Sequence, residues 1–242
     1  EGMSNLFPSS PIAGFKTGTK TGFRIGSYSF VPFIYNQQTG ELSLITSAEI
    51  NLVYQHDSEA PVYSLTDGQV ELAQRGIATF VDNPEMLETW APSDRPGTDD
   101  DVEVIVIGYN QHSSQLDELV SLHNTLGYSC NSVTVQWIYA NVEGYDIPEK
   151  IRNYVKNLYE NNGLLFVVIA GDRGTSTRLS QLEFPFSGQG PLNATTDLYY
   201  SDLDGSWDGN GNHLYGEEFD GMDYYSDIYV GRYPTNPVKL ML

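Results

Sequence analysis

Val102-Glu103-Val104-Ile105-Val106-Ile107-Gly108 is the stretch that decides the fold. A short and almost continuously apolar run that ends at a glycine is typical of a parallel strand buried on both faces. Apolar residues then recur at helical spacing from Ser113 or Ser114 to Leu126, and Gly127 ends this pattern. The chain therefore changes at about residue 101 into an alternation of strands and helices.

The alternation continues toward the end of the chain. We expect strands over residues 132–138, 164–172 and 227–231, and a helix over residues 149–160 that opens after Pro148. Strands that alternate with helices predict an α/β fold with a doubly wound, mostly parallel sheet and right-handed crossovers. The sheet is expected to be incomplete in this chain, because helices for its second face are missing before Leu242.

The residues before this region differ in composition and in hydrophobic periodicity. Residues 1–22 are rich in Gly, Pro, Ser and Thr and predict a loop, whereas residues 23–31, 33–35, 42–45 and 48–54 predict strands of a small antiparallel β unit. Residues 55–100 lose periodicity, apart from a short helix near residues 68–73, and read as a connecting arm. We therefore predict a β-rich part over residues 1–57, an arm over 58–100 and an α/β portion over 101–242.

The charge of the chain excludes several classes of function. Its 242 residues hold 32 acidic and 12 basic side chains, which gives a net charge of −20. Nucleic-acid and anionic-membrane binding need clustered Lys and Arg, so neither is expected. No apolar run is long enough to span a membrane, and a single cysteine cannot form an internal disulfide. Metal ions or basic peptides are better partners for so acidic a surface.

An acidic stretch near the end of the chain predicts a cation site. No Lys or Arg lies between Arg178 and Arg232, so the carboxylates there repel one another unless something compensates them. Carboxylates and amides two residues apart, separated by glycines, are how a loop directs hard oxygen ligands at calcium. The spacing is not that of an EF-hand, and a solvated cluster of acidic turns is the alternative. The predicted calcium ligands are Asp202, Asp204, Asp208, Asn210, Asn212 and Glu217, with Glu218 as an alternative to the last.

An ordered series of segments resembles one protein family. The segments from Gly22 to Leu42 are similar to the propeptide of gingipain-like cysteine peptidases (family C25), and those from Leu126 to Pro234 to the first part of their catalytic domain. The order of the segments carries the resemblance. They are Gly22-Phe23-Arg24-Ile25, residues 32–42, Leu126-Gly127-Tyr128, residues 147–156, residues 166–172, Thr196-Asp197-Leu198-Tyr199-Tyr200, residues 202–208 and Asp227-Ile228-Tyr229-Val230-Gly231-Arg232.

The resemblance implies a caspase-like fold, secretion or cell-surface display, and a zymogen whose propeptide, together with the arm, shields the site until removed. It implies endopeptidase activity on protein or peptide substrates, in which a thiolate attacks the peptide carbonyl and an imidazole assists. By the resemblance, Asp227 is the carboxylate that orients the histidine. The catalytic Cys and His are expected downstream of Leu242, which leaves open a second chain that carries them.

Other candidate residues have structural interpretations. Cys130 starts the second predicted strand, at the edge opposite to the carboxyl ends where such sheets place their sites, so we interpret it as a structural thiol. His112 follows the first strand at the favourable edge, and Asp172 follows the third, where it either serves a site or caps its loop. Two other functions stay open: a non-catalytic, calcium-stabilised surface or inhibitory module of the same fold, and a small-molecule hydrolase, which has only fold analogy in its favour.

Overall fold

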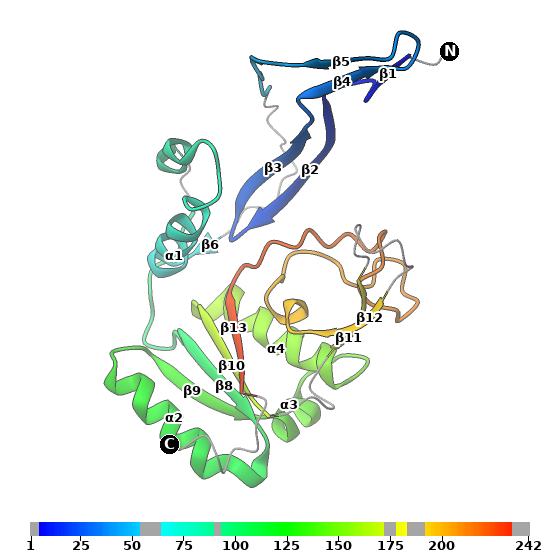
Figure 1. Ribbon diagram of the computed structural model, residues 1–242. Coiled ribbons are helices and arrows are strands. Elements are labelled where there is room, and N and C mark those ends of the chain that lie inside the picture. Colours follow the sequence, from blue (N-terminus) through cyan, green and yellow to red (C-terminus); the bar gives the residue numbers. More distant parts are fainter. Residues whose placement is uncertain (1–4, 54–63, 90–92, 172–177, 183–191, 234–242) are drawn as a thin grey trace. The chain divides into compact units, whose positions relative to one another are not determined.

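The computed structural model describes residues 5–53, 64–89, 93–171, 178–182 and 192–233 (Figure 1). The chain divides into two compact units. The first holds residues 1–18 and 24–61, and the second holds residues 19–23 and 62–242. The turn at residues 19–23 therefore belongs to the second unit, although it joins two strands that continue into the first. No described helix is both long and apolar enough to cross a membrane.

A four-stranded parallel sheet forms the centre of the second unit (Figure 1). Its order is β13-β10-β8-β9, so the first strand in sequence lies inside the sheet and later strands are added on both sides of it. This arrangement confirms the predicted mostly parallel α/β sheet and is consistent with a caspase-like fold. The strands are β8 (Val104–Gly108), β9 (Cys130–Thr134), β10 (Phe166–Ala170) and β13 (Tyr229–Tyr233).

The central strand β8 is buried on both faces, as its apolar run predicts. Val104 and Val106 pack with Leu116 of α2, whereas Ile105 and Ile107 join a larger core on the other face with residues of α3 and α4. All four β8 side chains are at most 2% exposed. The helices are α2 (Ser113–Thr125), α3 (Val135–Asn141) and α4 (Ile147–Asn162).

Helix α4 has a clear start and stop. The Asp146 carboxylate accepts a hydrogen bond from the Glu149 amide at 3.0 Å, and Pro148 occupies the first turn, where its missing N–H costs nothing. Gly163 ends the helix with φ of 68°, a left-handed conformation that glycine adopts without strain. These signals are visible in the sequence, which is why this helix was predictable to within a few residues.

The second strand of the sheet is shorter than predicted. Residues 132–138 were expected to be extended, but β9 ends at Thr134 and α3 begins at Val135. The Thr134 hydroxyl accepts a hydrogen bond from the Trp137 amide at 3.2 Å and so caps the new helix. The apolar run alone did not distinguish a strand from a buried helix turn, and the cap decides it.

The remaining described elements of the second unit are short. The predicted helix near residues 68–73 is confirmed as α1, which begins after a capping box formed by Thr66 and Gln69. The elements are α1 (Asp67–Ile77), β6 (Ser64–Leu65), β7 (Ser93–Asp94), β11 (Arg178–Leu182), β12 (Leu192–Thr196) and the 3-10 turns η1 (Pro84–Thr89), η2 (Asn110–His112) and η3 (Leu198–Tyr200).

The N-terminal strands are antiparallel, and two sequence predictions there were wrong. Residues 1–22 were expected to be loop, but β2 pairs with β3, a partner that local composition does not reveal. Residues 48–53, expected to be a strand, have no regular structure. The strands predicted at residues 33–35 and 42–45 are confirmed as β4 and β5, which pair antiparallel. The strands are β1 (Leu6–Phe7), β2 (Ile12–Lys20), β3 (Phe23–Phe30), β4 (Phe33–Asn36) and β5 (Glu41–Leu44).

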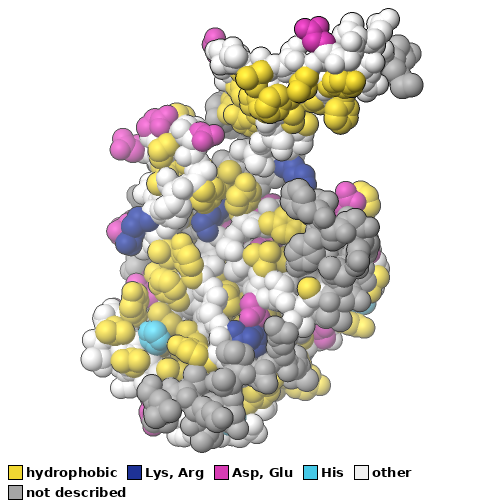
Figure 2. Space-filling model, viewed as in Figure 1, with side chains coloured by type: hydrophobic (Ala, Val, Ile, Leu, Met, Phe, Trp, Pro, Cys, Tyr) yellow, Lys and Arg dark blue, Asp and Glu magenta, His cyan; other side chains and the backbone are white. Residues whose placement is uncertain are grey.

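The first unit buries little apolar surface of its own. Figure 2 shows apolar side chains gathered on the strands of this unit. Phe7, Phe15, Leu42 and Leu44 are each more than half exposed. Small antiparallel sheets of this size are marginal without a covering layer. The stable core of the chain is therefore the parallel sheet of the second unit.

Candidate functional site

The acidic segment, residues 197–228, connects β12 to β13 and is almost free of regular structure. It is nevertheless anchored in the larger core by Tyr199, Tyr200, Trp207 and Tyr215, all at most 6% exposed. The rings of Trp207 and Tyr215 lie edge-on to Tyr199, with centroids 5.5 and 5.8 Å away. The aromatic residues thus fix the start and the middle of the segment against the sheet.

Arg152 supplies the positive charge that the segment itself lacks. From helix α4, its Nε donates to the Tyr199 carbonyl at 2.9 Å, and its Nη2 donates to the carbonyls of Asp202 and Gly205 at 2.7 and 2.8 Å. Burial lowers the pKa of this guanidinium, but an arginine stays charged in proteins. Sequence reasoning missed Arg152, because it counted cations only between Arg178 and Arg232.

Asp227 is buried at the amino end of β13. It is 7% exposed, and its two carboxylate oxygens accept hydrogen bonds from the amides of Thr21 and Leu203, both at 2.8 Å. Burial, reinforced by the nearby negative charge of Asp204, raises the pKa of Asp227 to about 7. The pKa of this buried carboxyl therefore lies well above its ordinary value, although its two amide donors favour the ionised form.

The turn between β2 and β3 is attached to the residues just before β13. Thr21, with φ of 49°, also donates its hydroxyl to the Asp227 carbonyl at 2.9 Å. The Lys20 ammonium donates to the Ser226 carbonyl, and the Thr19 amide donates to the Asp223 carboxylate. Residues more than 200 positions apart in sequence therefore form one hydrogen-bonded junction, which no local pattern could predict.

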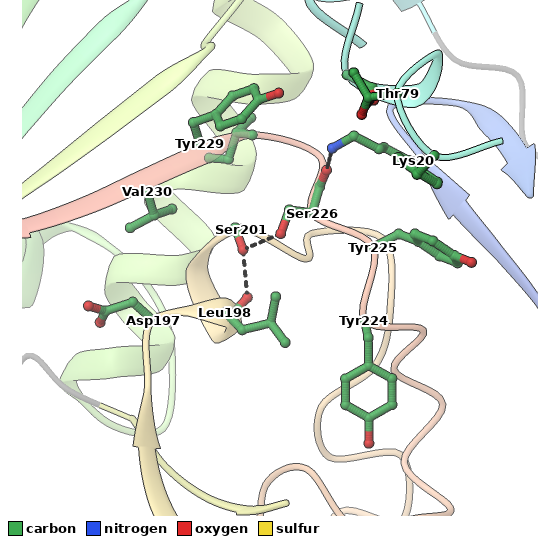
Figure 3. Close-up of a pocket in the computed structure, with 13 residues that line it drawn as sticks. Lys20, Thr79, Asp197, Leu198, Ser201, Tyr224, Tyr225, Ser226, Tyr229 and Val230 are labelled. Carbon is green, nitrogen blue, oxygen red and sulfur yellow. Dashed lines mark hydrogen bonds between the residues drawn. The ribbon is translucent and has the colours of Figure 1, made fainter. Parts of the chain in front are cut away.

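A pocket of about 640 Å³ lies beside this junction (Figure 3). Its lining includes Lys20, Thr79, Asp197, Ser201 and Tyr229. Figure 3 shows the Lys20 amine directed at Ser226, whose hydroxyl lies 3.0 Å from the Ser201 hydroxyl. Among the described residues that line it there is no cysteine or histidine, so the pocket holds no thiol–imidazole pair.

The predicted calcium ligands are divided into two groups by the structure. Asp202 and Asp204 lie with Asp227, and one carboxylate oxygen from each of the three residues lies within 4.8 Å of the others. Asp202 is fully buried; its Oδ1 accepts from the Gly205 amide at 3.1 Å. Burial and the charge of Asp223 raise the pKa of Asp202 to about 6.

The side chains of the second group form hydrogen bonds within the same loop. The side-chain amides of Asn210 and Asn212 donate to Glu217 Oε2 at 3.2 and 2.7 Å, and the Asp208 carboxylate contacts His213 Nδ1 at 3.3 Å. Asp220, which the sequence analysis did not single out, is buried and closes this part of the loop by accepting from the amides of Gly209 and Glu217. An aspartate eleven residues from its donor gives no spacing signal.

In folds of this type, ligands bind at the carboxyl ends of the strands, the edge of the sheet opposite to Asp227. Tyr109 and Gly171 follow β8 and β10 there, and His112 lies in the turn after β8. Cys130 lies at the amino end of β9, is 3% exposed, and burial raises the pKa of its thiol. Such a thiol is a poor nucleophile, in line with a structural role. Asp172 lies outside the described residues.

The model of peptidase family C25 matches residues 97–241, which is more than half of the chain and includes every strand of the parallel sheet and the whole acidic segment. The chain belongs to peptidase family C25. Residues 1–96 lie outside this match to the C25 model.

Other comparisons with known proteins add little to the C25 assignment. A solved structure described as "Structure of Protease" is 18% identical, with a TM-score of 0.37 over 54% of this chain. The match spans only 24% of that protein's length. No curated protein matches the sequence.

Proposed function

We propose that this chain is the N-terminal portion of a cysteine endopeptidase precursor that is secreted or displayed at the cell surface and cleaves protein or peptide substrates. The single observation that supports the proposal is the C25 match over residues 97–241, which coincides with the parallel sheet and the acidic segment. The charge of −20 is compatible with substrates that carry basic residues and with an exterior environment.

The chemistry proposed is nucleophilic. A cysteine thiolate adds to the peptide carbonyl, a histidine imidazolium protonates the departing amine, and water then hydrolyses the acyl-enzyme. Both residues are proposed to follow Leu242, either in the same chain or in a partner chain that carries the remainder of the catalytic domain. Cys130 is not the candidate, because its thiol is buried at the amino edge of the sheet with a raised pKa.

The role of Asp227 as the carboxylate that orients the histidine stays a prediction from the resemblance. Two features bear on it. Asp227 precedes β13 and so lies at the amino edge, about 17 Å of strand away from the carboxyl ends of the five-residue strands. Both of its carboxylate oxygens already accept backbone amides. The histidine would therefore have to reach the amino edge to meet it.

Residues 1–100 are proposed to be the end of a propeptide and an arm that keep the precursor latent. The support is the junction at residues 19–21, where a turn from the N-terminal part is bound to Asp223, Ser226 and Asp227. Removal of this part would break the hydrogen bonds to the backbone carbonyls of Ser226 and Asp227. It would also free one carboxylate oxygen of Asp227. Calcium, bound by the acidic segment, is proposed to stabilise the second unit.

A second candidate is a non-catalytic, calcium-stabilised inhibitory or surface module of the same fold. The observation in its favour is the carboxylate cluster of Asp202, Asp204 and Asp227, which a calcium-stabilised module would use without any catalytic residue. A module of this kind would cleave no peptide.

The test is to express the complete reading frame that encodes this chain and to measure hydrolysis of a peptide library before and after blocking thiols with iodoacetamide. Activity that iodoacetamide abolishes, and that maps to a cysteine downstream of Leu242, supports the peptidase. A frame without a downstream Cys and His, together with no cleavage of any peptide, would overturn it in favour of the module.

A further inference from the structure

One carboxylate oxygen in the acidic segment is buried without a hydrogen-bond donor. Asp202 is 0% exposed, and although its Oδ1 accepts the Gly205 amide, its Oδ2 has no donor among the residues that the structure describes. A buried carboxylate oxygen left without a partner is costly, so it needs an explanation in a ligand or a proton.

This carboxylate lies beside two others. A carboxylate oxygen of Asp202, one of Asp204 and one of Asp227 all lie within 4.8 Å of one another. Calcium binds oxygen at about 2.3–2.6 Å, so that two ligands on opposite sides of the ion are at most about 5 Å apart. Three carboxylates at these separations can therefore share a single ion.

The charged side chains around this cluster are more often acidic than basic. Asp202 interacts electrostatically with Asp204 and Asp223, and Asp227 interacts with Asp202 and Asp204. Arg152 acts on Asp202, Asp204 and Asp227, and Lys20 acts on Asp227. When all four carboxylates are ionised, they exceed the two cations by two negative charges, which one divalent cation balances. The described hydrogen bonds of both cations also go to backbone carbonyls.

We propose that Asp202, Asp204 and Asp227 bind one calcium ion in front of β13, with Asp202 Oδ2 as its buried ligand. The proposal refines the calcium binding proposed above by naming a ligand set that includes Asp227 and excludes Asp208, Asn210, Asn212 and Glu217. It does not depend on peptidase activity. The ion joins the segment after η3 to Asp227, two residues before β13, and through Asp227 to the turn at Thr21.

Calcium fits this cluster better than magnesium. All ligands are hard oxygens, and they come from an irregular loop and a strand end rather than from a rigid scaffold. Magnesium requires near-octahedral ligands at about 2.1 Å and keeps several waters, whereas calcium accepts irregular sets at longer distances. The fully buried Asp202 carboxylate gives magnesium fewer positions for the waters that it keeps.

The test is calorimetric titration of the chelator-treated chain with calcium chloride, together with thermal unfolding with and without calcium. At a calcium concentration about 100-fold above the dissociation constant, the unfolding midpoint is expected to rise by about 5–10 °C. Asp202→Asn and Asp204→Asn are each expected to weaken binding at least tenfold, since each removes one charged ligand of three.

Glu217→Gln and Asp208→Asn are the matched controls from the same segment, and their calcium affinity is expected to stay within about twofold of the unchanged chain. Without calcium, Asp202→Asn is expected to unfold at the same or a higher temperature than the unchanged chain, because one repulsive charge is gone. A purely structural role for Asp202 predicts a lower temperature. Asp204 is exposed, so its variant keeps the test valid if Asp202→Asn does not fold.

Three outcomes would overturn the proposal: no heat of calcium binding, unchanged affinity in both Asp202→Asn and Asp204→Asn, or loss of binding in Glu217→Gln alone. The last would place calcium at the second group of the acidic segment. Equal affinity for magnesium chloride would overturn the choice of calcium. Peptide hydrolysis by the complete reading frame is measured separately, so a failure of this site leaves the peptidase proposal standing, and the converse also holds.

Discussion

The parallel sheet and the acidic segment belong to the same unit of the chain but are stabilised by different interactions. The centre of the sheet consists of buried apolar side chains such as Ile105, Ile107 and Val167, which have no hydrogen-bonding groups. In the acidic segment the buried side chains Asp202, Asp220 and Asp227 accept backbone amides instead. Stability in the sheet therefore depends on apolar volume, and in the segment on the position of a few charges.

The largest effect is expected from removing apolar volume in the sheet. Ile107→Ala deletes a fully buried side chain of β8 and should lower the free energy of unfolding by about 2–5 kcal/mol. Denaturant titration of the two chains measures it, with and without calcium, and the loss should be the same in both. Leu122→Ala on α2 is the control, because Leu122 is 54% exposed and should cost less than about 0.5 kcal/mol. Equal losses for the two variants would mean that the core does not lie where the structure places it.

The next effect is expected from the cation that supports the acidic segment. Arg152→Met keeps the apolar stem but removes the donors to three carbonyls, and should cost about 1.5–3 kcal/mol. Lys156→Met on the same helix is the matched control; Lys156 forms a solvent-exposed pair with Glu160, and its loss should cost less than about 0.5 kcal/mol. Near-ultraviolet circular dichroism of the segment's tyrosines should change for the first variant alone. If Lys156→Met proves as costly as Arg152→Met, the segment is not anchored by Arg152.

Sequence patterns predicted the sheet better than the segment, for a physical reason. Apolar periodicity records which faces are buried, and it located β8, β10 and β13 as well as α2 and α4. It failed at β2, whose pairing with β3 is a matter of tertiary contact, and at residues 135–138, where the Thr134 cap starts a helix.

The contacts of the acidic segment leave no such pattern. Spacing along the chain correctly drew attention to Asp202 and Asp204 as neighbours, but Asp227 joins them from 23 positions beyond Asp204. The amide of Thr21, which binds Asp227, and the guanidinium of Arg152 come from distant elements. Polar side chains of this kind bond to backbone groups wherever the fold brings them, so their partners follow from the three-dimensional structure and not from sequence spacing.

Two glycines of the acidic segment are needed for different reasons, one for lack of space and the other for its backbone conformation. A methyl group at position 209 would lie 2.6 Å from the Asp220 carbonyl oxygen, so Gly209→Ala must displace that backbone and should cost about 1–3 kcal/mol. Gly211 has φ of 71° but open space around it, so Gly211→Ala should cost only the conformational strain of about 1 kcal/mol. Thermal unfolding of both variants measures the difference. A larger cost at position 211 would contradict the packing of the segment against Asp220.

The smallest effect is expected from a carboxylate outside the acidic segment. Glu160→Gln on α4 removes one negative charge from a side chain that is 54% exposed and pairs with Lys156 at 3.8 Å. Water and salt screen such a pair, so the free energy of unfolding should change by less than about 0.5 kcal/mol. The same neutralisation at Asp202 acts on a buried carboxylate among three others, where screening is weak. Calcium should therefore raise the unfolding temperature of Glu160→Gln as much as that of the unchanged chain. The Glu160 carboxylate lies in solvent and is not one of the proposed calcium ligands. A reduced calcium response in this variant would mean that total charge governs calcium binding, rather than the position of the three carboxylates in front of β13.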